Sequence, residues 1–546
     1  MMPLASAPVK VEIGWVDYLI IGVYFLVTLG IGFILRRRMK TSEDFFLSGR
    51  SLPSWVTGLA FLGANLGAIE ILGMGAAAAQ YGMMQAHFYW LGAIPAMIFV
   101  ALFMMPFYYG SKVHSVPGYL KLRFNEATRG FNAISFAVMT LLMSGINMYA
   151  MALVFNLLLG WSIDVSIWLS ALLIIGYISL GGLSSSIYNE TLQFFLIVLG
   201  LLPLTIIGLL KVGGWSGMVE RVNNPAFFHL WANTGGTGNP MAVNWLGIAL
   251  GLGFVLGFGY WCTDFLVVQR ALAAEDEAAA ERTPLIATFP KLFFPFIAIV
   301  PGMIILSLLP QLGHGGPENS YNMAIPYAIA YFFPSGILGL GLTALLASFM
   351  SGMAGNVTAF NTVWTYDIYR SYIYRNGSDR HYLNVGRITT VVGVLLSVGT
   401  AYITLHFSNI MDYVQALFSL FNAPLFATFL LGMFWKRTTA WGGFWGLLTG
   451  TLGALVMWGL QQVHVINYGS DMAGNLWRAW WAWLICFVVT IVVSLFTKPK
   501  PEAELKGLVY GLTAKAEAVE TAWYKKPIVL AGAAIILLIA LNVIFF

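Results

Sequence analysis

The chain has 546 residues, of which 59% are hydrophobic and only 9% are charged, and its formal net charge is +5. Soluble domains carry roughly 25% charged residues, so a soluble enzyme, a disordered scaffold and a secreted disulfide protein are excluded. An outer-membrane barrel is excluded as well, because its strands would be short segments of alternating polarity. Apolar runs of about 20 residues recur along nearly the whole chain, and each can cross a bilayer as a helix. The sequence therefore predicts an all-α polytopic membrane protein.

About fourteen hydrophobic spans are expected in chain order. They lie near residues 15–36, 53–82, 86–110, 130–158, 165–182, 186–211, 243–269, 284–309, 336–366, 383–406, 410–434, 440–464, 475–497 and 527–546. Basic residues gather in every second loop, and those loops include Arg36, Arg37, Arg38, Lys40, Lys112, Arg123, Arg270, Arg282, Arg380 and Lys515.

This alternation of charge predicts the orientation of the chain. Lys and Arg concentrate in cytoplasmic loops, so both termini are predicted to lie on the outer side of the membrane. The membrane itself is expected to be the cell membrane, either inner or plasma. The positive charge then follows from topology, and the lipid bilayer rather than nucleic acid is the expected partner. The cytoplasmic linker 498–526 mixes Glu502 and Glu504 with lysines, which favours a solvated surface helix.

Nothing in the sequence indicates catalysis. The histidines are scattered without metal-ligand spacing, and no Walker-type loop or nucleophile with its base is evident. Cys262 and Cys486 both lie in apolar runs, so a disulfide framework is not expected. The chain is predicted not to be an enzyme and to need no cofactor.

Several ionisable or polar side chains fall inside apolar spans. They are Glu70 in the second span, Glu190 at the start of the sixth, Asp264 in the seventh, Lys291 in the eighth, and Asp412 with Gln415 in the eleventh. Charged groups are costly in hydrocarbon, so they either line a water-filled path or form ion pairs between helices. Both alternatives remain open from the sequence.

The second span contains a further signal. Gly63, Asn65, Gly67 and Gly73 crowd its middle, and such a segment is a poor continuous helix. An unwound helix at mid-membrane exposes backbone carbonyls that can coordinate a cation. The ninth span has a matching polar patch, which consists of Ser348, Ser351 and Gly352.

Five segments make the chain resemble the sodium/solute symporter family, and within it the sodium/glucose and bacterial sodium/galactose branch. They are GLSSSIYNETLQ (182–193), YWCTDFLVVQRALAA (260–274), FNTVWTYDIY (360–369), MDYVQ (411–415) and LLGMFWKRTT (430–439). The resemblance implies a LeuT-type five-plus-five inverted repeat. Its expected parts are an extra N-terminal helix and loop (1–50), the two repeats (51–212 and 243–436), and peripheral C-terminal helices with the linker (437–546).

The resemblance also implies a sodium site, with sodium as co-substrate. Its expected ligands are the backbone of Gly63, Leu66 and Ser348 and the hydroxyl of Ser351. Gly352 stands where many members have a second hydroxyl, which departs from the family pattern.

The implied substrate residues are Glu70, Tyr89, Tyr260, Trp261, Lys291 and Gln415. Three positions depart from sugar-transporting relatives: Glu70 replaces a glutamine or histidine, Tyr89 replaces a glutamate, and Gly257 replaces a polar side chain. Gating and coupling roles are expected for Asn65, Met74, Met411, Asp412, Glu190 and Asp264.

The function expected from this resemblance is sodium-coupled inward symport of a monosaccharide by alternating access. An alternative is a sodium- or proton-coupled symporter, or a facilitative carrier, of another small polar solute. A membrane sensor with a transporter fold is disfavoured because the loops leave no room for a signalling domain. The sequence does not determine the oligomeric state.

Overall fold

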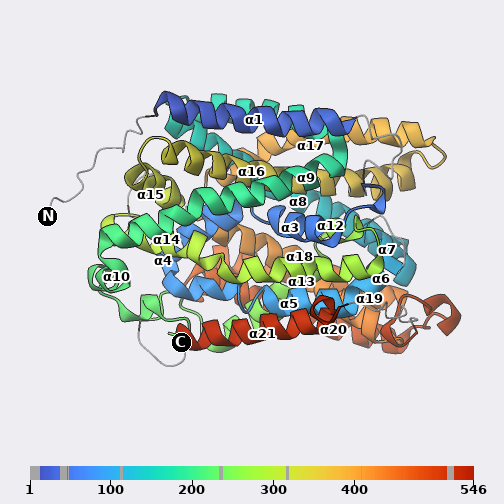
Figure 1. Ribbon diagram of the computed structural model, residues 1–546. Coiled ribbons are helices and arrows are strands. Elements are labelled where there is room, and N and C mark those ends of the chain that lie inside the picture. Colours follow the sequence, from blue (N-terminus) through green and yellow to red (C-terminus); the bar gives the residue numbers. More distant parts are fainter. Residues whose placement is uncertain are drawn as a thin grey trace.

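The computed structural model describes residues 13–36, 46, 48–110, 115–232, 238–314, 319–407, 409–512 and 522–546. Throughout these residues the regular structure is helical, and Leu52 and Ala274 form an isolated β-bridge. The long helices run roughly side by side in one bundle (Figure 1). The all-α prediction is therefore confirmed.

Ten helices in the described part of the chain are long and apolar enough to cross a membrane, or eleven if one bent pair counts as a span. The helices that contain the ten spans are α1 (Trp15–Arg36), α8 (Glu126–Leu159), α9 (Ile163–Val212), α13 (Glu277–Phe293) with α14 (Pro295–Leu308), α16 (Ile337–Thr362), α17 (Asp379–Thr404), α18 (Ile410–Phe434), α19 (Ala440–Gln462), α20 (Asp471–Phe496) and α21 (Pro527–Ile544). The bent pair joins α11 (Gly257–Thr263) to α12 (Phe265–Leu272) at an angle of 47°.

The other three expected spans fall on shorter or interrupted helices. The second span comprises α3 (Ser54–Gly63), the π-helical turn η2 (Ile69–Gly73) and α4 (Met74–Tyr81). The third comprises α5 (Ile94–Phe99), η4 (Val100–Met104) and α6 (Met105–Gly110). The fifth is the first part of α9, which kinks at Gly182 (φ 55°, ψ −149°). The count of fourteen spans stays a prediction.

Two spans are interrupted near the centre of the bundle. The second span loses its helical conformation between Gly63 and Ala68, as its glycines predict. The seventh breaks at Asp264, whose backbone is extended and whose carboxylate accepts a 2.9 Å hydrogen bond from the Leu266 N–H. This second break was not expected from the sequence. Asp264 thus caps the helix that follows the break.

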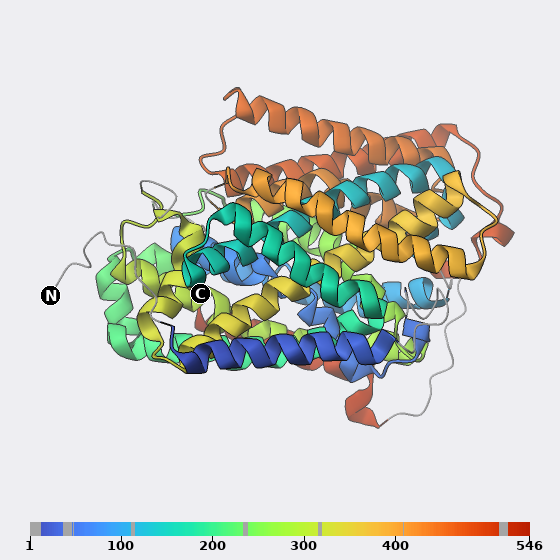
Figure 2. The same cartoon turned by 90° about the horizontal axis from the view of Figure 1, so that it is seen from above.

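Peripheral helices enclose this centre. Figure 1 places α1 and α21 along opposite edges, and Figure 2 shows α19 on the side away from α1. The start of α1 and the end of α21 lie at the same end of the bundle. Asp17 of α1 is buried and accepts hydrogen bonds from the N–H groups of Gly336 and Gly339 and from the Ser335 hydroxyl. It therefore caps α16 from a neighbouring helix.

Two expectations about the loops need correction. The described part of the linker 498–526 forms short 3₁₀ turns at Glu502–Leu505, Tyr510–Leu512 and Trp523–Lys525, rather than the expected surface helix. Arg123 and Arg270 are fully buried instead of solvated. Arg37, Arg38, Lys40, Lys112 and Lys515 lie outside the described residues.

Arg123 shows why a basic residue can be buried here. It comes from α7 (Val116–Arg123), and its guanidinium donates to the carbonyls of Gly432 (2.6 Å), Thr438 (3.0 Å) and Trp435 (3.1 Å). The Gly432 and Trp435 carbonyls lie at the C-terminal end of α18, where a helix has unpaired acceptors and a partial negative charge, and Thr438 lies in the turn that follows. Arg123 therefore holds α18 in place rather than facing water.

Candidate functional site

A cavity lies beside the two interrupted spans. Its cavity volume is about 80 Å³, several times the ~10–15 Å³ that one buried water needs. Its walls come from the break in the second span and from the segments around Tyr89, Asn147, Tyr260, Lys291 and Gln415. The cavity is thus shared by segments far apart in the sequence.

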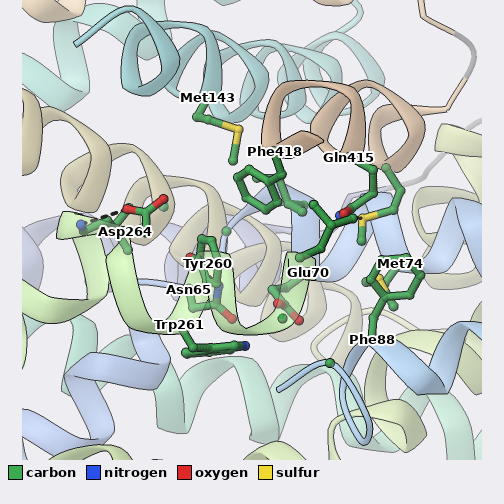
Figure 3. Close-up of a pocket in the computed structure, with 18 of the residues that line it drawn as sticks. Asn65, Glu70, Met74, Phe88, Met143, Tyr260, Trp261, Asp264, Gln415 and Phe418 are labelled. Atoms are coloured by element: carbon green, nitrogen blue, oxygen red, sulfur yellow. Dashed lines mark hydrogen bonds between the residues drawn. The ribbon is translucent and has the colours of Figure 1, made fainter. Parts of the chain in front are cut away.

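All six expected substrate residues line this cavity. They are Glu70, Tyr89, Tyr260, Trp261, Lys291 and Gln415. Figure 3 shows Asn65, Glu70, Tyr260 and Gln415 grouped round one space, with Met74 and Phe88 on one side and Asp264 on the other. The structure brings these side chains together.

A continuous chain of hydrogen bonds crosses the cavity wall. The Lys291 ammonium donates to a Glu70 carboxylate oxygen at 2.7 Å and to the Asn65 side-chain oxygen at 2.6 Å. The Asn65 amide in turn donates to the Tyr260 hydroxyl at 2.7 Å. The break in the second span is therefore joined through polar side chains to both α13 and α11.

Two opposite charges in the cavity wall, those of Lys291 and Glu70, compensate each other. The Lys291 side chain is 2% exposed and the Glu70 side chain 13%. The ammonium also lies 4.8 Å from the Tyr89 ring centre and 5.2 Å from that of Trp261, positions that favour cation–π attraction. The second Glu70 oxygen is buried and has no hydrogen-bond partner within the described residues. The Lys291–Glu70 pair is thus neutral as a unit and leaves one acceptor to pair, and Asp264 adds a separate carboxyl group to the lining.

Part of the cavity lining is apolar. Met74, Phe88, Leu252, Leu256 and Phe418 form this part. The rings of Phe418 and Tyr260 lie 5.0 Å apart between centres. A bound solute would therefore meet both polar groups and apolar side chains.

Two glycines bring backbones together at this cavity. A Cβ atom built on Gly257 would lie 2.2 Å from the carbonyl oxygen of Gly92. Both residues line the cavity. No side chain fits at Gly257 without a backbone shift, so this part of the wall presents backbone alone.

The expected sodium residues form a second cluster on the other side of the break. The Ser348 hydroxyl donates to the Leu66 carbonyl at 2.6 Å, and the Ser351 hydroxyl donates to the Gly63 carbonyl at 2.8 Å. Both serines are fully buried. The Ser348 side chain thus contacts the Leu66 carbonyl, and the expected role of the Ser348 backbone stays a prediction. Four oxygens from two spans therefore converge, which suits a hard cation.

Gly352 does not leave a gap beside these oxygens. A Cβ atom at Gly352 would lie 2.4 Å from the Asn147 side-chain oxygen and 2.7 Å from the Cα of Gly67. Real Cβ atoms do not approach so closely, so a residue larger than glycine would force the helices apart. Gly352 sets the spacing of α16 against the break.

The expected gating residues divide into two groups. Asn65, Met74, Met411 and Asp264 line the cavity. Asp412 lies elsewhere, where it accepts a 3.1 Å hydrogen bond from the Tyr81 hydroxyl.

Glu190 also lies apart from the cavity lining. It is fully buried and pairs with Arg270, whose Nε donates at 3.1 Å, while the Ser186 hydroxyl donates at 2.5 Å. Of the two alternatives left open by the sequence, the ion pair between helices therefore holds for Glu190. The backbone of Glu190 packs against Gly63, where a Cβ would lie 2.7 Å from its carbonyl oxygen.

Two asparagines at the cavity were not singled out from the sequence. Asn147 and Asn356 both line it. Asn147 accepts a 2.8 Å hydrogen bond from the Ala68 N–H, which begins the helix after the break. Each asparagine places a polar amide inside a predicted span, so the sequence alone could have indicated both residues.

Comparisons with known proteins agree with this geometry. Residues 45–450 match the family described as SSF: Sodium:solute symporter family. The chain belongs to this family. It is therefore a multi-pass membrane transporter and not an enzyme, and it has a sodium ion as co-substrate.

The similar proteins include several sodium/glucose cotransporters. The one from Vibrio parahaemolyticus is 28% identical over 468 residues, which cover 82% of this chain and 85% of that protein. Sodium/glucose cotransporter 2 of Rattus norvegicus is 28% identical over 556 residues, covering 92% and 82%. Sodium-coupled symport is supported by this likeness.

A solved structure shows the fold. The substrate-bound, outward-open Na⁺-coupled sialic acid symporter aligns with a TM-score of 0.75 and 22% identity, covering 89% of this chain and 99% of that one. The transporter fold is therefore confirmed, while the division into repeats at 51–212 and 243–436 stays a prediction.

The buried pair between Lys291 and Glu70 generates a test of stability in this symporter. Lys291→Met leaves the Glu70 carboxylate buried without its counter-ion, which costs about 3–5 kcal/mol. Adding Glu70→Gln removes the charge, so the double variant should recover most of the lost thermal stability. The measurement is the thermal unfolding midpoint of purified protein. The exposed pair Lys436–Glu502 provides the control, because Lys436→Met should hardly change the midpoint. Additive losses in the double variant would contradict the pairing.

Proposed function

We propose that this protein drives the inward symport of a monosaccharide with the sodium gradient. The observation that supports this most directly is the position of the broken second span. Its carbonyls of Gly63 and Leu66 face the buried hydroxyls of α16, while its Asn65 and Glu70 side chains face the cavity. One interrupted segment thus serves both an ion site and a solute site.

The sodium assignment rests on the donor set. Sodium is a hard cation and favours oxygen ligands, and the cluster offers two carbonyls and two hydroxyls. Sulfur and imidazole ligands are not part of this set. We propose Gly63, Leu66, Ser348 and Ser351 as its ligands, with Gly352 shaping the helix beside them.

The sugar assignment rests on the compensated Lys291–Glu70 ion pair and on ring contact. The Lys291–Glu70 pair cancels its own charge, the Gln415 amide offers a donor and an acceptor, and the buried Glu70 oxygen needs a donor. A neutral polyol supplies such hydroxyl donors and acceptors. Tyr260 offers an aromatic face for the apolar side of a sugar ring. The relatives named as sodium/glucose cotransporters favour the same class.

A second candidate is a small polar solute with fewer hydroxyl groups than a hexose. The apolar wall of Leu252, Leu256 and Phe418 favours it, as does the backbone contact between Gly92 and Gly257. These residues offer few donors to a solute that is polar all round, and an unpaired hydroxyl there would lose its hydrogen bonds to water.

We further propose how the cavity opens. In this proposal Met74 and Met411 form the outer gate and Tyr260 the inner gate of the cavity that they line, and the buried Glu190–Arg270 pair would close the cytoplasmic route from the sodium cluster. Alternating access would then move the repeat at 51–212 against the repeat at 243–436. Both termini would lie outside an inner or plasma membrane.

Transport in liposomes tests the proposal directly. Purified protein should accumulate a labelled monosaccharide from a panel of solutes under an inward sodium gradient, and not under a matched potassium gradient. Gln415→Ala should weaken apparent solute affinity by roughly 5- to 150-fold, because a solute hydroxyl loses its partner. Accumulation driven by protons without sodium would overturn sodium coupling. Accumulation of a less hydroxylated solute alone would favour the second candidate.

The sodium cluster generates a separate prediction. Ser351→Ala removes a ligand oxygen and should raise the half-saturating sodium concentration, while solute affinity at saturating sodium changes little. Ser397→Ala is the matched control, because this buried serine donates only to the Gly393 carbonyl of its own helix. Equal sodium dependence in both variants would contradict the assigned site.

The orientation is tested by labelling cysteines in intact cells. His314→Cys should react with an impermeant thiol reagent, whereas Ser378→Cys should be spared, because residues 313–320 are expected outside and 376–387 inside. Both positions are exposed in the structure, and the native Cys262 and Cys486 are buried. The reverse labelling pattern would invert the orientation.

A further inference from the structure

The break in the second span leaves backbone groups that need partners. The first N–H groups after a helix break have no acceptor within their own helix. Within hydrocarbon such groups must be satisfied by the protein itself. At this break, the Ala68 N–H donates to the side-chain oxygen of Asn147 at 2.8 Å. Asn147 comes from α8 and is 1% exposed.

Asn147 is held in a fixed orientation. Its amide nitrogen donates to the Met143 carbonyl of its own helix at 3.0 Å, which directs the side-chain oxygen toward Ala68. The same oxygen would lie 2.5 Å from a Cβ on Gly67 and 2.4 Å from a Cβ on Gly352. The two glycines therefore make the space that this carboxamide fills.

The position of Ala68 connects the two clusters described above. Two residues before it, the Leu66 carbonyl accepts from Ser348, and two residues after it, the Glu70 carboxylate accepts from Lys291. Asn147 itself lines the solute cavity. A group that fixes the Ala68 N–H thus fixes the chain between the ion cluster and the solute cavity.

We propose that Asn147 is a positioning residue that couples sodium binding to solute binding by holding the broken span at Ala68. This inference rests on the proposed sodium-coupled function. Asn147 is not itself a sodium ligand in this proposal. Asn147 acts through the backbone from Leu66 to Ala68. Gly352 is small because a larger residue at that position would displace the Asn147 side chain.

Sodium-dependent thermal stability tests this role without knowledge of the solute. A ligand that binds the folded state raises the unfolding midpoint as its concentration increases. Purified protein is titrated with sodium chloride, with choline chloride keeping the ionic strength constant. Asn147→Leu, which is similar in size but lacks the oxygen, should raise the sodium concentration for the half-maximal shift roughly 10-fold.

The controls separate coupling from simple destabilisation. Asn132→Leu replaces another buried asparagine of α8, whose side-chain oxygen has no partner among the described residues, and it should leave the sodium dependence unchanged. If Asn147→Leu behaves like Asn132→Leu, Asn147 has only a structural role and this inference is wrong. If the parent protein shows no response to sodium, the proposed function fails and this inference fails with it.

Discussion

The structure depends on one constraint: a helix interrupted inside a membrane must find partners for its freed backbone groups. Lipid offers none, so neighbouring helices must supply them. Here α16 supplies the hydroxyls of Ser348 and Ser351 to the carbonyls before the break, and α8 supplies the Asn147 oxygen to the N–H after it. Interrupting the span is possible only because these side chains converge on it. The same convergence creates a polar site in the middle of an otherwise apolar protein.

Charge compensation imposes a second constraint, which connects the two expected repeats. Glu70 pairs with Lys291, and Glu190 pairs with Arg270. In each pair the acid comes from residues 51–212 and the base from residues 243–436. Separating either pair would leave a buried charge without its partner, which is strongly unfavourable. Any relative motion of the two segments must therefore preserve these pairs or replace them. Solute hydroxyls can replace partners at Glu70 and Lys291, because that pair faces the cavity.

The sequence predicted one of the two central breaks but not the packing around them. Glycines at 63, 67 and 73 indicated the break in the second span because glycine disfavours a helix. The break at Asp264 was missed, since its span holds an ordinary apolar pattern and the capping role of Asp264 depends on the local backbone. Arg270 was placed in a loop because basic charge alone does not reveal a buried acid on another helix. Gly352 was interpreted as a lost ligand, although the space beside it belongs to Asn147 and Gly67. Such packing depends on tertiary contacts, which the spacing of residues along the sequence does not reveal.

The hydrogen bonds at the proposed sodium site also indicate how an ion would change the protein. The Ser348 and Ser351 hydroxyls donate to the Leu66 and Gly63 carbonyls at 2.6 and 2.8 Å. A cation accepts no hydrogen bond, so both hydroxyls must turn their hydrogens away before all four oxygens can face it. The oxygens then repel one another and are held together by the ion alone. The break would adopt a different geometry with the cation bound, and the short chain from Leu66 to Glu70 would transmit that difference to the cavity. Because such linkage is reciprocal, a solute that favours the ion-bound geometry raises sodium affinity by the same factor.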